Sequence, residues 1–250
     1  MRLKNKIAVI PGGTAGIGKE IALGYAKEGA VVIVCSRGDE HVNAMTGIIK
    51  KSGYEGLSLK VDITKKEEVD AMIDRVVKEY GRVDIMLNSV GFYPATPFLQ
   101  ISREEWHRVM DINLNGSFYC AQAAAHVMVK QRSGRIIFIT SGQALHGVAL
   151  MAHYSASKGA LVSFTRALAA ELSPLGINVN AIAAGLTTTD MVNNAIPEEY
   201  LKIAAQKMAV RRLARPDEYV GIAVLLGSDD GGYITGETIA VDGGHSNVAS

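Results

Sequence analysis

Cysteine is scarce in this sequence, and the two that occur, Cys35 and Cys120, lack the spacing of a metal site. A chain with so few thiols is typical of a reducing compartment, so we expect a cytoplasmic protein and no bound metal. The chain also lacks any apolar run near the roughly 20 residues that a membrane span requires. Residues 1–6 lead only into a short apolar stretch, which does not have the form of a signal peptide. We therefore expect no membrane partner.

Neither charge predominates, because 26 Lys and Arg residues stand against 25 Asp and Glu residues, for a formal net charge of +1. Without a basic field, we expect no nucleic-acid partner. Repeats, low-complexity tracts and Pro- or Ser-rich linkers are also missing, so nothing marks a domain boundary. A chain of 250 residues that is 48% hydrophobic can form one large α/β domain or two small ones. The missing boundary favours a single domain over residues 1–250.

What the sequence does contain is a series of short apolar runs separated by helical patterns. Residues 7–10 are a continuous apolar run, as expected for a strand buried on both faces, and residues 31–35, 57–61, 83–87 and 135–139 are the next predicted strands. Strands that alternate with helices in this rhythm predict an α/β fold with a doubly wound, parallel sheet. Such sheets bind ligands beyond the carboxyl ends of their strands, so polar residues at those ends are candidates for a site.

A glycine-rich turn follows the first of these runs. Gly12, Gly16 and Gly18 lie between the run and a helical pattern that continues to Gly29. Backbone amides without side chains, together with a helix N-terminus, can hold a phosphate group. The spacing is looser than the strict G-x-G-x-x-G fingerprint, and a tight strand-to-helix turn is the alternative interpretation.

Polar residues also end the next three runs. Ser36 and Arg37 follow the second run, where enzymes that prefer NAD(H) carry an acidic residue for the ribose 2′-hydroxyl. A guanidinium and a hydroxyl can instead bind a 2′-phosphate, so we expect NADP(H) as the cofactor, with NAD(H) as the alternative. Asp62 follows the third run and either accepts a hydrogen bond from adenine or caps the helix that begins near Lys65. Asn88 follows the fourth run at the same edge.

The second half of the chain contains candidates for proton transfer. Tyr154 and Lys158 begin a helical repeat and lie one turn apart on one face. A nearby ammonium favours the phenolate, so the pair can move protons, although this spacing also occurs as surface decoration. Ser141 ends the fifth run and either hydrogen-bonds a substrate oxygen or caps a turn. Asn113 lies inside a long helix opened by a capping box at Ser102, where it points to solvent or has a specific partner.

Together these motifs resemble the short-chain dehydrogenase/reductase family over nearly the whole chain. The family's T-G-x-x-x-G-x-G loop appears at 11–18 with Pro11 for threonine, and its N-N-A-G motif appears at 88–91 as Asn-Ser-Val-Gly. Its P-G-x-x-x-T motif appears at 184–189 with Ala184 for proline, and residues 236–244 resemble its closing strand and turn. The family's catalytic tetrad is matched at the usual spacings by Asn113, Ser141, Tyr154 and Lys158.

The resemblance implies a Rossmann domain with seven parallel strands and an NAD(P)-dependent oxidoreductase that needs no metal, because the cofactor carries the hydride. It implies that Tyr154 is the general acid in reduction and the base in oxidation, with a pKa lowered by Lys158. Lys158 would also hold the nicotinamide ribose, Ser141 would orient the carbonyl, and Asn113 would hold a water that relays the proton. The residues expected at the cofactor are Gly12, Thr14, Ala15, Gly16, Ile17, Gly18, Ser36, Arg37, Asp62, Ile63, Asn88, Val90, Gly91, Tyr154, Lys158, Gly185, Thr187 and Thr189.

Family resemblance also implies a substrate lid at about 186–212 and a homodimer or homotetramer formed through two helices rich in small residues. Close packing inside one subunit would produce the same composition, so it is the alternative to assembly. The residues expected at the substrate are Ser141, Tyr154, Tyr93, Gln143, His146, Met151 and Met191. We expect no catalytic role for His146.

These residues predict a small or medium, partly apolar alcohol or ketone as the substrate, and ordinary packing is the alternative for each of them. The sequence favours an NADP(H)-dependent carbonyl reductase or alcohol dehydrogenase. A 3-oxoacyl thioester reductase and a dehydrogenase of sugars, polyols or cyclic alcohols are alternatives within that class. A cofactor-sensing protein without turnover is the alternative from another class, and the complete tetrad argues against it.

Overall fold

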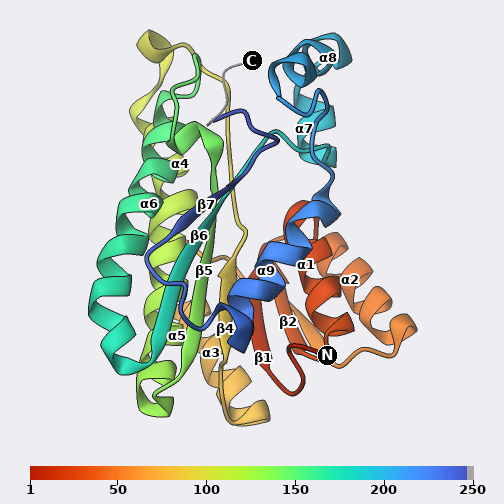
Figure 1. Cartoon of the computed structure of the whole chain (residues 1–250), viewed down its shortest axis with the longest axis vertical. Coiled ribbons are helices and arrows are strands. Elements are labelled where there is room, and N and C mark those ends of the chain that lie inside the picture. The colour runs from red at the N-terminus through yellow and green to blue at the C-terminus, as the bar shows by residue number, and fades with distance from the viewer. Residues whose placement is uncertain (247–250) are drawn as a thin grey trace.

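The computed structural model describes residues 1–246, except for the side chains of Met191 and Ala195. At its centre is a sheet of seven parallel strands in the order β3-β2-β1-β4-β5-β6-β7 (Figure 1). The strands are β1 (Ile7–Pro11), β2 (Val31–Ser36), β3 (Gly56–Lys60), β4 (Ile85–Asn88), β5 (Gly134–Ser141), β6 (Ile177–Ala184) and β7 (Thr238–Val241). The doubly wound, parallel α/β fold that the sequence predicts is therefore confirmed.

Helices cover both faces of this sheet (Figure 1). They are α1 (Gly16–Lys27), α2 (Asp39–Ser52), α3 (Lys66–Tyr80), α4 (Arg103–Met110), α5 (Gly116–Gln131), α6 (Ala152–Leu172), α7 (Asp190–Ala195), α8 (Glu198–Lys207) and α9 (Val220–Gly227). Successive residues of one strand face opposite layers: Ile7 and Val9 pack with α3, α5 and α6, whereas Ala8 and Ile10 pack with α1, α2 and α9. Burial on both faces explains why the runs are apolar without alternation.

The segments that follow the strands meet at the carboxyl edge of the sheet. The Ser89 N–H donates to the Pro11 carbonyl oxygen at 2.9 Å, so the loop after β4 is tied to the end of β1. Residues 186–212 form α7 and α8, which stand above this edge on the side of α1 and α9 (Figure 1). The long connection after β4 and the start of α6 stand on the other side of this edge (Figure 1).

The long helix predicted after Ser102 is interrupted, which corrects the sequence prediction. A single π-helical turn, Asp111–Asn115, joins α4 to α5, and Asn113 lies within it. The Ser102 hydroxyl accepts from the Glu105 N–H at 3.0 Å, but the Glu105 carboxylate contacts His153 instead of returning to Ser102. Only half of the predicted capping box therefore forms. Such single π turns inside α-helices often accompany functional sites.

Candidate active site

Tyr154 and Lys158 lie one turn apart near the start of α6, as their spacing predicts. The Lys158 side chain is 3% exposed, and its Nζ donates to the carbonyl oxygens of Ile139 at 3.0 Å and Val90 at 3.3 Å. The same Nζ lies 5.9 Å from the centroid of the Tyr154 ring. Lys158 therefore joins α6 to the ends of β5 and β4, directly beneath the candidate proton donor.

Burial sets the protonation of this pair. Burial raises the pKa of Tyr154 to about 12; a hydrogen bond with the Ser141 side chain lowers it, and the nearby Tyr93 raises it. Burial also lowers the pKa of Lys158 to about 8, because its ammonium has no carboxylate partner in this environment. We expected Lys158 to lower the pKa of Tyr154, and the direction here is the opposite. The ammonium is bound to two carbonyl oxygens, and the loss of hydration of the phenolate dominates.

Ser141 is the last residue of β5 and is buried. Its hydroxyl accepts from the Gln143 N–H at 3.2 Å and shares a hydrogen bond with the Tyr154 side chain. Parallel pairing of β5 with β4 and β6 places this hydroxyl at the carboxyl edge. Ser141 therefore closes a turn and stands beside Tyr154, and its hydrogen bond to a substrate oxygen stays a prediction.

Asn113 has specific partners and is fully buried. Its Oδ1 accepts from the Phe92 N–H at 2.8 Å, and its Nδ2 donates to the Phe92 carbonyl oxygen at 2.9 Å and to Ser157 Oγ at 3.0 Å. The Ser157 hydroxyl in turn donates to the Tyr154 carbonyl oxygen at 2.7 Å. Asn113 therefore fixes the loop after β4 against the first turns of α6. A role in holding a water for proton relay stays a prediction.

The sequence prediction missed a buried pair beside Tyr154. His153 is fully buried, its Nδ1 accepts from the Tyr154 N–H at 2.9 Å, and its Nε2 lies 3.0 Å from Glu105 Oε1. Because Nδ1 is an acceptor, the ring proton lies on Nε2 and points at the carboxylate. The contact with Thr96 and that with His153 both lower the pKa of Glu105. The contact between Glu105 and His153 joins residues 48 positions apart, so no local pattern could have indicated it.

The glycine turn has the shape of a cradle for a dinucleotide. Gly12 has a φ of +79°, and a Cβ built there would lie 2.8 Å from the Ser89 carbonyl carbon. A Cβ at Gly18 would lie 2.3 Å from the Gly12 carbonyl oxygen. Two further side chains that we predicted at the cofactor, Ser36 and Asn88, have a buried Oγ and a buried Nδ2 without a hydrogen-bond partner in the described part of the chain. Close backbone approach and unpaired polar atoms fit a bound nicotinamide dinucleotide.

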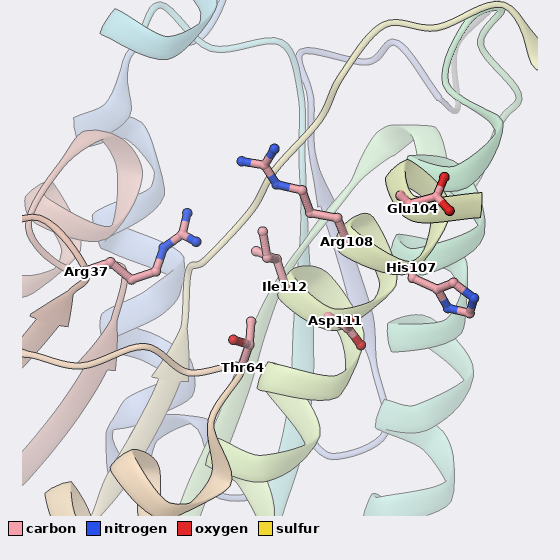
Figure 2. Close-up of a pocket in the computed structure, with 7 residues that line it drawn as sticks. All are labelled: Arg37, Thr64, Glu104, His107, Arg108, Asp111 and Ile112. Carbon is pink, nitrogen blue, oxygen red and sulfur yellow. The ribbon is translucent and has the colours of Figure 1, made fainter. Parts of the chain in front are cut away.

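A cavity of about 400 Å³ lies beyond β2 and β3. Figure 2 shows Arg37 and Arg108 extending into it from opposite sides, above Thr64 and Ile112, while Glu104, His107 and Asp111 complete the lining from α4 and the π turn. The Arg108 guanidinium also lies 4.5 Å from the centroid of the Phe92 ring. Arg37 lies where the sequence predicts, whereas Arg108 was missed because it belongs to α4, far away along the chain.

Asp62 holds a local turn at the edge of this cavity. Its Oδ1 accepts from the Thr64 N–H at 3.0 Å and from the Thr64 hydroxyl at 2.8 Å. Lys65, not Asp62, is the N-cap residue of α3, so the helix-cap alternative is wrong. Ile63 is buried, and its side chain packs against Gly116. An adenine contact for Asp62 stays a prediction.

The other residues predicted at the cofactor lie around the same edge. Thr14 is buried in the glycine turn, which also contains Ala15 and Ile17. A Cβ at Gly16 would lie 3.4 Å from Thr189 Cγ2, so the turn and the start of α7 are neighbours. The Thr187 hydroxyl donates to the Gly185 carbonyl oxygen at 2.9 Å and lies 2.8 Å from the Tyr219 hydroxyl oxygen. A Cβ at Gly91 would lie 3.7 Å from Lys158 Nζ, so this glycine is a neighbour of the buried lysine.

The residues predicted at the substrate fall into two groups. Tyr93 and Gln143 lie beside Tyr154 and Ser141: the Tyr93 ring meets the Tyr154 ring edge-on at 5.8 Å, and the Gln143 N–H binds Ser141. His146 lies further out, with its ring edge-on to His245 at 4.5 Å and its Nδ1 3.3 Å from Ser246 Oγ. Met151 is buried at the start of α6, and the side chain of Met191 lies outside the described residues. Several apolar side chains between Ser141 and Tyr154 and on α8 are exposed: Leu145, Val148, Leu150, Tyr200 and Ile203.

Within residues 1–246, no helix combines the length and the apolar character needed to cross a membrane. Among the described side chains, no group of three or more His, Cys, Asp or Glu residues is arranged to hold a metal ion.

Comparisons with known proteins agree with this architecture. A family model described as enoyl-(acyl carrier protein) reductase matches residues 12–246. A curated 3-oxoacyl-[acyl-carrier-protein] reductase from Thermotoga maritima is 33% identical over 249 residues, which cover 98% of this chain and 99% of that protein. A solved short-chain type dehydrogenase/reductase from Mycobacterium marinum is 34% identical, with a TM-score of 0.93 and coverage of 98% and 97%. A solved NAD⁺-bound xylitol dehydrogenase is 26% identical, with a TM-score of 0.92 and coverage of 98% and 100%.

The sheet order, the glycine cradle and these likenesses define the class: an oxidoreductase that uses a nicotinamide dinucleotide. The resemblance read from the sequence motifs is confirmed by the family model and by the relatives. The chain belongs to the short-chain dehydrogenase/reductase family.

Proposed function

We propose that this chain is an NADP(H)-dependent oxidoreductase that interconverts a small or medium alcohol and its ketone, with Tyr154 as the general acid and base. The observation that carries the proposal is the position of the Tyr154 side chain. It is hydrogen-bonded to Ser141, stands one turn from the buried Lys158, and lies at the sheet edge that also holds the glycine cradle. A cofactor-sensing protein without turnover would not require Tyr154, Ser141 and Lys158 to lie together at this edge.

In the reductive direction, Tyr154 donates its proton to the carbonyl oxygen, and in oxidation it accepts the proton back. A pKa of about 12 keeps the phenol protonated at neutral pH, which is the form that reduction requires. Ser141 donates a second hydrogen bond and stabilises the charge that develops on the oxygen. NADP(H), when bound, supplies or accepts the hydride. Lys158, with a pKa of about 8, can bind ribose hydroxyls and exchange a proton near neutral pH.

We propose that the cavity in Figure 2 receives the adenosine end of the cofactor. The amides of the glycine turn face the pyrophosphate, and Ser36 and Arg37 contact the 2′-phosphate. The unpaired Ser36 Oγ supports this assignment, as does Arg108, which brings a second guanidinium to the same cavity. Arg37 directly after β2, at the position where an acidic residue would hold a ribose 2′-hydroxyl, and Arg108 on α4 favour NADP(H) over NAD(H).

Kinetics with both cofactors test this preference. We expect a higher kcat/KM for NADPH than for NADH in the wild type. Arg37→Ala removes a charge-assisted contact worth about 1.5–3 kcal/mol, so the NADPH/NADH ratio should fall about 10- to 100-fold. Arg75→Ala removes an exposed arginine on α3 and should keep the wild-type ratio. A wild type that prefers NADH contradicts the proposal.

A 3-oxoacyl thioester reductase is the second candidate, favoured by the name of the Thermotoga maritima relative. A polyol dehydrogenase is the third, favoured by the xylitol dehydrogenase structure. Oxidation of NADPH with acetoacetyl-CoA, and reduction of NADP⁺ with xylitol, distinguish these candidates from a reductase of simple ketones.

We also propose that two copies pair through α5 and α6. On α6 the small residues Ala156, Ser163, Ala167 and Ala170 are exposed, so they are free to contact a second copy, and the partly exposed Phe118 of α5 lies beside Phe164 of α6. By contrast, the small residues of α5 are buried within the subunit, which agrees with the alternative that they serve close packing inside one chain: Ala121, Ala123 and Ala124. Light scattering at micromolar concentration should give a dimer or tetramer, and a monomer contradicts the proposal.

A further inference from the structure

Two polar atoms beside Tyr154 have no partner in the described part of the chain. The Tyr93 hydroxyl and Gln143 Oε1 are both shielded from solvent, and neither makes a hydrogen bond. Buried polar atoms in native proteins are almost always paired, because an unpaired one loses the hydration that it has in the unfolded chain. Two such atoms next to a candidate site indicate that a ligand supplies the missing partners.

Both atoms belong to residues that contact the proposed proton-transfer groups. The Tyr93 ring packs edge-on against the Tyr154 ring at 5.8 Å, and the Tyr93 phenol contributes to the raised pKa of Tyr154. The Gln143 N–H donates to Ser141 Oγ at 3.2 Å. Tyr93 and Gln143 are therefore neighbours of the two residues that we propose to hold the reacting oxygen.

The chemistry of the two atoms selects the group that can satisfy both. A phenol hydroxyl can donate, whereas an amide oxygen only accepts. A single oxygen that pairs with both must accept from Tyr93 and donate to Gln143, which a hydroxyl does and a carbonyl, ether or thioester oxygen does not. Because Tyr93 packs against Tyr154 and the Gln143 backbone bonds Ser141, we place this hydroxyl on the carbon next to the reacting one.

We infer that the substrate is an α-hydroxy ketone in reduction and a vicinal diol in oxidation, with Tyr93 and Gln143 binding the hydroxyl that does not react. The inference rests on the proposed function and names its substrate class. In reduction the carbonyl carbon gains the hydride and the carbonyl oxygen gains the Tyr154 proton, so NADPH becomes NADP⁺ and the second hydroxyl is unchanged. The oxygen of the alternative 3-oxoacyl thioester lies further from the reacting carbon and cannot donate.

A matched pair of probes tests the inference. Hydroxyacetone and butan-2-one have the same shape and differ by a hydroxyl in place of a methyl group. A site built to hydrogen-bond a hydroxyl strongly rejects the analogue without it, so kcat/KM with NADPH should favour hydroxyacetone about 100-fold or more. Tyr93→Phe keeps the ring contact with Tyr154 and should reduce this preference at least tenfold, and Gln143→Leu should do the same. Tyr233→Phe removes a fully exposed phenol and should keep the wild-type preference.

Equal kcat/KM values for the two ketones, or a preference that survives in both Tyr93→Phe and Gln143→Leu, contradict the inference while the proposed function stands. A higher kcat/KM for acetoacetyl-CoA than for hydroxyacetone contradicts it as well. If NADPH is consumed with none of the three compounds, with propane-1,2-diol likewise inert in oxidation, the proposed function fails and the inference fails with it.

Discussion

Lys158 offers a test that requires neither cofactor nor substrate. Its side chain is 3% exposed, and burial lowers its pKa from 10.5 to about 8. Between these two pH values the unfolded chain binds a proton that the folded chain has lost, so stability must rise with pH across this window. Above pH 10.5 both states hold Lys158 without its proton, so burial of the side chain carries no charge penalty. This stability is lost as the pH falls from 10.5 to about 8. The pKa difference corresponds to about 3 kcal/mol, most of which falls between pH 7 and pH 10.

The perturbation is Lys158→Met, which keeps the length of the side chain and removes the ammonium. The variant loses the bonds to Ile139 and Val90, which shifts its stability by a constant amount and leaves the pH dependence as the observable. We expect the free energy of unfolding of the wild type to rise by about 2–3 kcal/mol relative to Lys158→Met from pH 7 to pH 10. Urea unfolding at four pH values measures this difference.

Lys130→Met is the matched control, because Lys130 is an exposed lysine in the last turn of α5. Its ammonium is hydrated in the folded and the unfolded chain, so this variant should follow the wild-type pH dependence. A difference between wild type and Lys158→Met that stays constant from pH 7 to pH 10 refutes the reasoning, because it would mean that Lys158 titrates alike in both states.

Two further substitutions address the cradle and the support of Tyr154. Gly18→Ala places a methyl group 2.3 Å from the Gly12 carbonyl oxygen and should weaken NADPH binding at least tenfold in a fluorescence titration, whereas Gly47→Ala, with no atom within 4 Å, should bind as the wild type does. Unchanged affinity in Gly18→Ala contradicts the cradle. His153→Leu leaves the Tyr154 N–H without its acceptor and should lower the free energy of unfolding by about 1–3 kcal/mol in urea. A His153→Leu variant as stable as the wild type shows that this contact is dispensable.

The sequence predicts the fold where burial is symmetric. The five predicted strands become β1 to β5 with small changes at their ends, and β1, β2 and β4 are the most apolar because they are buried on both faces. β6 could not be recognised in the same way, since Asn178 and Asn180 interrupt it. Their amides donate to the carbonyl oxygens of Gly232 at 2.9 Å and Ile234 at 2.8 Å, more than 50 positions away. Only the completed fold shows these partners.

The site shows the same division. The spacing of Tyr154 and Lys158 fixes their common helix face, so their proximity could be predicted. The direction of the Tyr154 pKa could not, because it depends on how completely the phenol is buried and on the carbonyl oxygens that Lys158 finds. The π turn at Asn113 was also hidden, since it is held by contacts with Phe92 and Ser157 from other segments.

Tyr154→Phe tests the central claim most directly, because it removes one oxygen and keeps the ring beside Tyr93 and Lys158. General acid catalysis contributes about 10²–10⁴-fold, so we expect kcat with NADPH and hydroxyacetone to fall by at least about 100-fold. The Kd for NADPH, measured by isothermal titration calorimetry, should stay within about threefold of the wild-type value, because the phenol transfers a proton and does not hold the phosphates. A Tyr154→Phe variant that turns over at the wild-type rate contradicts the account.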